Sequence, residues 1–124
     1  RALQSAKLQA VDVLMLDTAG RYVPVRTIFQ ILDAMSWAKL NVFHWHLSDD
    51  QSFPVLTKST PYLARGAFSR KQIYTVDMLK LVVAHAKDRG IRVIPEFEMP
   101  AHATSWSHGT ESQSLTLAQL SVGC

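Results

Sequence analysis

The chain has 124 residues, of which 48% are hydrophobic and 19% are charged, a composition typical of one globular domain and not of a disordered segment. Its net charge is only +3 and its basic residues are scattered, which argues against a nucleic-acid-binding surface. No apolar run reaches the roughly 18 residues of a membrane span, and the first residues lack the layout of a signal peptide. We therefore expect no membrane span and a mature or shortened chain. Cys124 is the only cysteine, so neither an internal disulfide nor a cysteine-based metal site can form within one chain.

The first half of the chain is predicted to form a strand, a helix and a second strand. Residues 11–17 are apolar and lead into Thr18-Ala19-Gly20, which is typical of a buried strand that ends in a turn. Pro24 then opens a helix, and a second strand covers residues 41–47. The helix is predicted because apolar residues recur at the three-and-four spacing of one buried face: Ile28, Ile31, Leu32, Met35 and Ala38.

A second helix and a third strand are predicted after a loop that contains Pro54, Pro61 and Gly66. Thr75 has a side chain suited to a helix N-cap, and Gly90 ends the helix. The third strand covers residues 91–98, with Pro95 near its end, where the loss of one backbone donor is tolerated. The helix again has an apolar stripe, made of Met78, Leu79, Val82, Val83 and Ala86.

This alternation predicts an α/β fold with parallel strands joined by right-handed crossovers. A closed (β/α)8 barrel and an open doubly wound sheet both fit the pattern. Polar residues follow the carboxyl ends of successive strands, where such folds bind their ligands: Asp17, then His46 with Asp49, then Glu98 with His102. No phosphate-binding glycine motif follows the first strand, which argues against a nucleotide site.

Alternation within residues 41–47 separates two faces of the predicted strand. His44 and His46 lie two residues apart and share one face, while Phe43, Trp45 and Leu47 take the other. We expect the aromatic residues to be packing residues and the imidazoles to lie near a polar site.

Three blocks of sequence resemble glycoside hydrolase family 20, the β-N-acetylhexosaminidases. Residues 14–19 (LMLDTA) are similar to the first barrel strand of the family, and residues 44–54 (HWHLSDDQSFP) to the segment after its second strand. Residues 89–102 (RGIRVIPEFEMPAH) resemble the segment on its third strand. The resemblance covers about residues 11–106 as the N-terminal part of a catalytic barrel. It leaves residues 1–10 as a lead-in and residues 107–124 as a tail of unknown role.

The resemblance implies a partial TIM (β/α)8 barrel of about the first three β/α units, since a whole barrel takes about 250 residues. It implies a glycosidase that removes terminal N-acetylglucosamine or N-acetylgalactosamine from glycans or chitooligosaccharides, with retention and with no metal or other cofactor. The acetamido oxygen of the substrate serves as nucleophile, a Glu protonates the leaving oxygen, and a neighbouring Asp orients the acetamido group.

The resemblance also assigns site residues. Asp49 and His102 match positions that support the catalytic carboxylates. The expected substrate-binding residues are Asp17, Arg21, His46 and Glu98. Glu96 and Glu98 share a strand face, and Glu98, nearer the strand end, is the better candidate for a supporting role. Trp106 fits both sugar stacking and ordinary burial.

Two departures from the family pattern affect this assignment. The chain contains no Asp-Glu dipeptide, so the general acid and its Asp partner are missing and the chain alone is expected to be incomplete. The family places an Arg where this chain has Gly20, and Arg21 can replace it only if the loop rearranges.

Two other functions remain open. A non-catalytic sugar-binding fragment is favoured by Gly20 and by the absent acid. A metal-dependent barrel hydrolase would use the His-x-His pair of His44 and His46, completed by Asp49 or His102. The expected protein partner is the remainder of the barrel or a second copy of the chain, because a half barrel leaves strand edges unpaired. The location of the protein is not predicted from the residues; the resemblance alone suggests a lysosomal or secreted protein.

Overall fold

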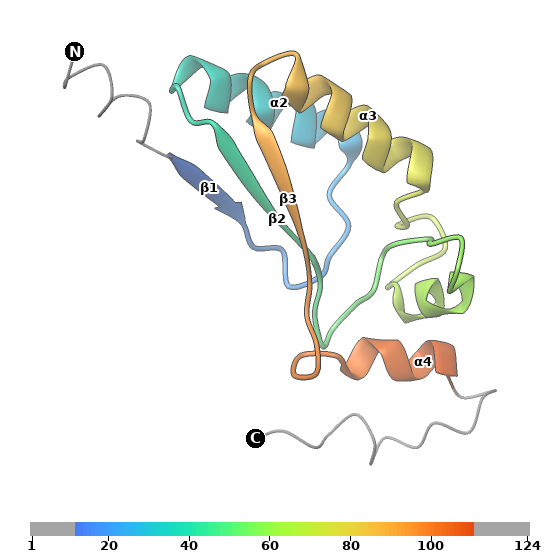
Figure 1. The fold of residues 1–124 in the computed structure, drawn as a ribbon. Coiled ribbons are helices and arrows are strands. Elements are labelled where there is room, and N and C mark those ends of the chain that lie inside the picture. The colour runs from blue at the N-terminus through green and yellow to red at the C-terminus, as the bar shows by residue number, and fades with distance from the viewer. Residues whose placement is uncertain (1–11, 111–124) are drawn as a thin grey trace.

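The computed structural model describes residues 12–110 as a three-stranded parallel sheet with two helices along one face (Figure 1). The strands lie side by side in chain order, and one helix connects each strand to the next, as the alternation predicts. The ends of the elements differ from the predicted ends by one or two residues. The strands are β1 (Val13–Leu16), β2 (Val42–Ser48) and β3 (Arg92–Phe97), and the helices are α2 (Val25–Trp37) and α3 (Val76–Lys87).

Local residue chemistry accounts for the helix boundaries. Pro24 precedes the first residue of α2, where a missing N–H leaves no intrahelical bond unmade. The Thr75 hydroxyl accepts a hydrogen bond from the backbone N–H of Met78 at 3.3 Å, which confirms the predicted N-cap of α3. Gly90 follows α3 with φ of +68°, a left-handed conformation that glycine adopts at least cost.

The core lies between the helices and one face of the sheet. The predicted alternation of β2 is confirmed, because Phe43, Trp45 and Leu47 are buried beneath the helices. Two predictions of buried helix residues are wrong: Ala38 lies beyond the last residue of α2, and Val83 is turned by about 100° from buried Val82. Ile31, Met78 and Leu79 are only partly buried, whereas the fully buried helix residues are Ile28, Leu32, Met35, Val82 and Ala86.

The opposite face of the sheet carries exposed apolar residues. Met15, His44 and Ile94 are opposite one another in register, and Met15 and Ile94 are 55% and 39% exposed. Val13 on the same face is 51% exposed. Pro95 lies opposite Trp45 in β3, which has a neighbouring strand on one side only within residues 12–110. Its missing N–H therefore disrupts no ladder there.

The loops contain the short helices η1 (Pro61–Gly66), η2 (Thr104–Trp106) and α4 (Ser107–Thr110). The predicted lead-in over residues 1–10 lies outside the described residues, as do residues 111–124 of the predicted tail. Within residues 12–110, none of the helices has the length and apolar character needed to cross a lipid bilayer.

Candidate functional site

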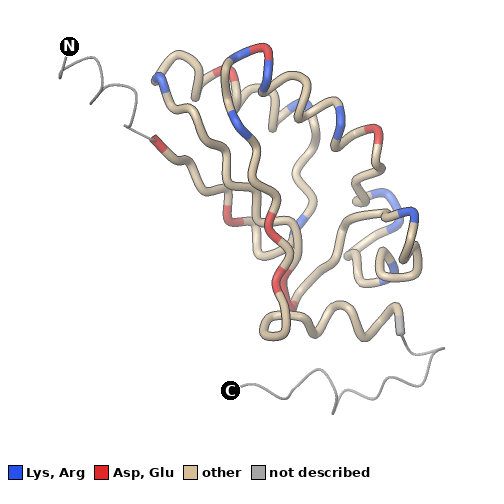
Figure 2. The backbone as a smooth tube through the Cα atoms, viewed as in Figure 1, with Lys and Arg blue, Asp and Glu red and all other residues tan. Residues whose placement is uncertain are grey.

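Acidic residues gather where the three strands end. Asp17 follows β1, Asp49 and Asp50 follow β2, and Glu96 and Glu98 lie at the end of β3 (Figure 2). Because the strands are parallel, these ends meet at one edge of the sheet. The structure therefore brings together the polar residues that the sequence predicts after successive strands.

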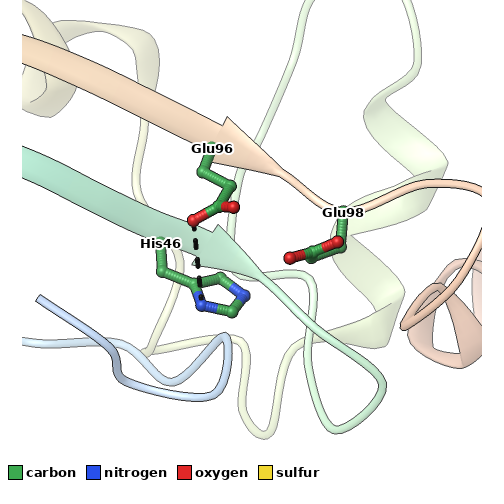
Figure 3. A group of neighbouring side chains, drawn as sticks. All are labelled: His46, Glu96 and Glu98. Atoms are coloured by element: carbon green, nitrogen blue, oxygen red, sulfur yellow. Dashed lines mark ion pairs between the residues drawn. The ribbon is translucent and has the colours of Figure 1, made fainter. Parts of the chain in front are cut away.

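His46 is the centre of this group. Its Nδ1 lies 3.5 Å from Oδ1 of Asp17 and 4.0 Å from Oε2 of Glu96, and its Nε2 lies 3.8 Å from Oδ2 of Asp49. Figure 3 shows the carboxylate of Glu96 directed at the imidazole ring, with the carboxylate of Glu98 beside them. The His46 side chain is 11% exposed, so its contacts with the carboxylates are only partly screened by water. One imidazole therefore connects the ends of all three strands, and we call Asp17, His46, Asp49, Glu96 and Glu98 the acid–imidazole cluster.

A backbone carbonyl fixes the proton on one nitrogen of His46. Nε2 lies 2.8 Å from the carbonyl oxygen of Ser48, and a carbonyl oxygen only accepts, so Nε2 donates. Nδ1 then accepts in the neutral ring and can donate to Asp17 or Glu96 only when the ring carries a second proton.

Glu96 contacts both histidines of β2. Its Oε2 lies 2.9 Å from Nε2 of His44 in addition to its contact with His46. Glu98 is placed by its backbone, whose N–H donates to the buried Ser48 hydroxyl at 3.2 Å. Sequence reasoning favoured Glu98 and missed the contacts of Glu96. Parallel register was the available signal, since Glu96 is the residue opposite His46.

Asp49 and His102 form a pair in the loops beyond β2 and β3. Oδ1 of Asp49 lies 3.2 Å from Nδ1 of His102 and also accepts the backbone N–H of Asp50 at 2.7 Å. Since a carboxylate only accepts, Nδ1 of His102 donates and its Nε2 is left as an acceptor. Asp49 is buried, while the His102 side chain is 62% exposed, so the free nitrogen belongs to an accessible ring.

The chain that carries His102 is fastened to the loop after β2 by contacts that sequence reasoning missed. Asp50 accepts both the backbone N–H of Thr104 at 3.0 Å and its hydroxyl at 2.8 Å. These two bonds hold the pKa of the Asp50 carboxyl below its usual value. The buried Ser105 hydroxyl donates to the carbonyl of Asp49 at 2.6 Å. No sequence signal marks this Ser as distinct from the many other serines of the chain.

Gly20 lies against the loop that holds Asp49. It is buried with φ of +67°, and a Cβ there would lie 2.7 Å from the N of Asp49 and 2.3 Å from the O of Ser52. Those two atoms are the donor and acceptor of one hydrogen bond of 3.1 Å, which closes the turn from Asp49 to Ser52. This backbone therefore has no room for a side chain at the position where the family carries Arg.

Arg21 belongs to a hollow next to the cluster but does not form an ion pair with it. Its guanidinium lies 5.8 Å from the ring centroid of Phe68. The hollow has a volume of about 530 Å³ and is lined by Asp17, Thr18, Ala19, Arg21 and Val23. Trp106 packs edge-on against Phe53 with 5.3 Å between ring centroids, which favours a packing role for that ring.

Two groups of described side chains have the composition of a metal site. One consists of His46, Glu96 and Glu98, and the other of Asp49, Asp50 and His102, with ligand atoms within 4.8 Å of one another in each group. Neither group contains both His44 and His46. The predicted alternative in which the two histidines bind one metal therefore finds no support in this geometry.

Comparison with known proteins places this geometry in a family. The profile described as "Glycosyl hydrolase family 20, catalytic domain" matches residues 13–122. The chain is 46% identical over 100 residues to the rat protein named beta-hexosaminidase subunit beta, covering 80% of this chain and 19% of that protein. It is 49% identical over 96 residues to beta-hexosaminidase 1 of Arabidopsis thaliana, covering 77% of this chain and 18% of that protein. The chain thus spans about a fifth of the length of these relatives.

Solved structures give the same result. The chitobiase of Flavobacterium johnsoniae superposes with a TM-score of 0.74 at 37% identity, over 82% of this chain and 15% of that one. The beta-N-acetylhexosaminidase of Bacteroides fragilis gives a TM-score of 0.73 at 36% identity, over 79% of this chain and 21% of that one.

The fold prediction is confirmed at this point: the three parallel strands and the two helices that connect them are part of an α/β barrel of the kind found in these enzymes. A family profile that covers most of the chain, relatives above 40% identity and superposable barrels agree with one another. The chain belongs to glycosyl hydrolase family 20, the glycosidase family of the β-hexosaminidases.

Proposed function

We propose that this chain forms part of the catalytic barrel of a β-N-acetylhexosaminidase, which hydrolyses terminal N-acetylglucosamine or N-acetylgalactosamine from glycans or chitooligosaccharides. The observation that carries the proposal is the convergence of three strand ends on His46, with the Asp49–His102 pair beside it. Membership of the family supports the same reaction.

Each residue has a role that follows from its contacts. Asp49 holds the His102 ring by Nδ1, so that Nε2 is free to accept a hydrogen bond from a protonated catalytic carboxyl or from the sugar. Asp17 and Glu98 present carboxylates, which accept hydrogen bonds from sugar hydroxyls. His46 lies between acids from all three strands, and its Nδ1 can donate to Asp17 or Glu96 when the ring carries a second proton.

The proposed chemistry is retaining and assisted by the substrate. The acetamido oxygen attacks the anomeric carbon as the glycosidic bond breaks, and a glutamic acid gives its proton to the leaving oxygen. Water then attacks the same carbon of the oxazolinium intermediate, reopens the ring and returns a proton to the glutamate. The two attacks come from opposite faces and each inverts the anomeric carbon, so the configuration is retained overall.

The catalytic Asp-Glu pair of this scheme is proposed to lie on further strands of the barrel. The 124 residues contain no Asp-Glu dipeptide. Val13, Met15 and Ile94 leave an exposed apolar patch on the sheet face that also carries His44. We propose that the remaining strands of the barrel cover this face, because burial of apolar surface in water is favourable.

The test uses the full-length protein with a chromogenic N-acetylglucosaminide and the matching glucoside, which lacks the acetamido group. We expect turnover of the first alone, and NMR of the first-formed sugar should show the β anomer. No turnover of either compound would contradict the hydrolase. Equal turnover of both, or a first-formed α anomer, would contradict substrate assistance.

A non-catalytic sugar-binding protein is the second candidate, because Gly20 leaves no room for the side chain that the family places there. It predicts measurable affinity for N-acetylglucosamine by calorimetry with no turnover of the chromogenic compound. Turnover that Asp49→Asn lowers by about 10- to 100-fold would exclude it.

A further inference from the structure

We propose that Arg21, Tyr22, Phe68 and Gln72 form a second saccharide subsite beside the acid–imidazole cluster. The inference rests on the proposed function and deepens it, because it states where a further sugar ring of the same glycan binds. The ligand class is a β-linked N-acetylglucosamine oligomer of two or more units.

The turn after β1 brings Arg21 to Phe68. The backbone N–H of Arg21 donates to the carbonyl of Thr18 at 2.9 Å and closes a tight turn, with Gly20 packed against the loop of Asp49. Since Gly20 has no side chain, Arg21 is the first long side chain after the turn. Its guanidinium reaches Phe68, in the loop that follows η1, and not the carboxylates of the cluster.

The residues there have the chemistry of a sugar-binding surface. They line a hollow of about 300 Å³, and the Phe68 ring is 57% exposed, so the guanidinium covers only part of it. A pyranose has an apolar face of C–H groups, which packs on an aromatic ring, and an edge of hydroxyls, which pair with Arg and Gln donors. No acidic residue within residues 12–110 forms an ion pair with Arg21, which leaves its N–H groups available to a ligand.

One wall of the hollow, the Tyr22 ring, is fixed by the core. The Tyr22 ring packs on Tyr74 with 4.6 Å between centroids, and the Tyr74 hydroxyl both accepts from the N–H of Val23 at 2.6 Å and donates to its carbonyl at 2.9 Å. A rigid wall reduces the conformational entropy that a ligand must remove on binding. Arg21 and Tyr22 are therefore presented on an anchored segment.

The position of this subsite relative to the cluster points to a connected ligand. Arg21 also lines the larger hollow that contains Asp17, and Asp17 pairs with His46. The two hollows thus share one side chain and lead from the cluster to Phe68. We place the terminal sugar of the glycan at the cluster and a further ring of the same glycan against Phe68.

The test compares N-acetylglucosamine with its β-1,4-linked trimer, made with thioether linkages that resist hydrolysis, by isothermal titration calorimetry on the full-length protein. Phe68→Ala and Arg21→Ala should each weaken the trimer about five- to tenfold and the monosaccharide less than about twofold. Matched controls are Trp37→Ala, an aromatic residue 89% exposed on α2, and Arg92→Ala, an exposed arginine at the opposite end of the strands. The controls should change neither affinity.

The outcomes separate this inference from the proposed function. If the wild-type protein binds both sugars and Phe68→Ala leaves the trimer unchanged, or weakens both sugars equally, the subsite is wrong and the proposed function stands. If the wild-type protein binds neither sugar and turns over no N-acetylglucosaminide, the proposed function fails and the subsite fails with it. A melting curve of each variant by circular dichroism identifies any loss of affinity that comes from unfolding.

Discussion

Asp49 and His102 are 53 residues apart in the chain, yet Oδ1 of Asp49 lies 3.2 Å from Nδ1 of His102. If the pair acts as a unit, Asp49→Asn and His102→Phe in the full-length enzyme should each lower kcat/KM by about 10- to 100-fold, the range expected for a lost hydrogen bond to a charged group. The double variant should lose little more than either single variant.

A surface acid supplies the control for these single and double variants. Asp77→Asn removes a carboxylate that is 89% exposed, and it should change kcat/KM by less than about twofold. The pH profile of kcat/KM should change shape in the Asp49 and His102 variants and keep its shape in the control. Fully additive losses would show that the two side chains act independently.

Two glycines provide a matched test of the loop that holds Asp49. Gly20 and Gly90 have φ of +67° and +68°, but a Cβ at Gly90 would meet nothing within 4 Å, while one at Gly20 would strike Asp49 and Ser52. Ala at either position must adopt the left-handed backbone conformation, which costs roughly 1 kcal/mol. Gly20→Ala should lower the free energy of unfolding by about 1–3 kcal/mol more than Gly90→Ala does, because backbone atoms of Asp49 and Ser52 must move. Chemical denaturation measures this difference, and equal losses would contradict the close packing.

Alkaline pH should destabilise the fold through Tyr74. Burial raises the pKa of its hydroxyl to about 12, above the value of about 10 in an unfolded chain. The folded state therefore retains a proton that the unfolded state releases, so this stabilisation is complete below pH 10 and is lost as the pH rises to 12. The loss is on the order of 2–3 kcal/mol.

Tyr74→Phe isolates this contribution. The variant should be less stable at pH 7 by roughly 1–2 kcal/mol, because the hydroxyl bonds to Val23 are lost. Its free energy of unfolding should then vary less than that of the wild type between pH 10 and 12. Parallel pH curves for the two proteins in urea denaturation would show that Tyr74 does not control alkaline stability.

The core between the helices and the sheet should respond to truncation according to burial. Leu32 is fully buried on α2, whereas Leu81 on α3 is 58% exposed. Leu32→Ala should cost about 2–5 kcal/mol of unfolding free energy, and Leu81→Ala less than about 0.5 kcal/mol. A large loss for Leu81→Ala would indicate that another part of the protein covers the outer face of α3.

The fold could be predicted from the sequence because its signals are local and periodic. The alternation of Phe43, Trp45 and Leu47 with His44 and His46 gives the two faces of β2 directly. The error at Val83 has a similar origin, since an apolar side chain beside a buried stripe can face outward as easily as inward.

The contacts of the site depend on register and on loop backbone, which periodicity does not contain. Glu96 meets His46 only because β2 and β3 pair in one register. His102 has φ of +56°, and the bonds from Thr104 to Asp50 and from Ser105 to Asp49 fasten the segment that carries it. Sequence blocks could indicate Asp49 and His102 as a pair of site residues, but not the serine and threonine that hold them together.

The most direct test of the central claim is NMR of the histidine side chains in the full-length protein, titrated with N-acetylglucosamine. We predict that the imidazole signals of His46 and His102 shift with one common dissociation constant. The signals of His85, which pairs with Asp33 between α2 and α3, should stay in place. Saturating sugar that leaves His46 and His102 unmoved, or that moves His85 as much, would contradict a sugar pocket at the acid–imidazole cluster.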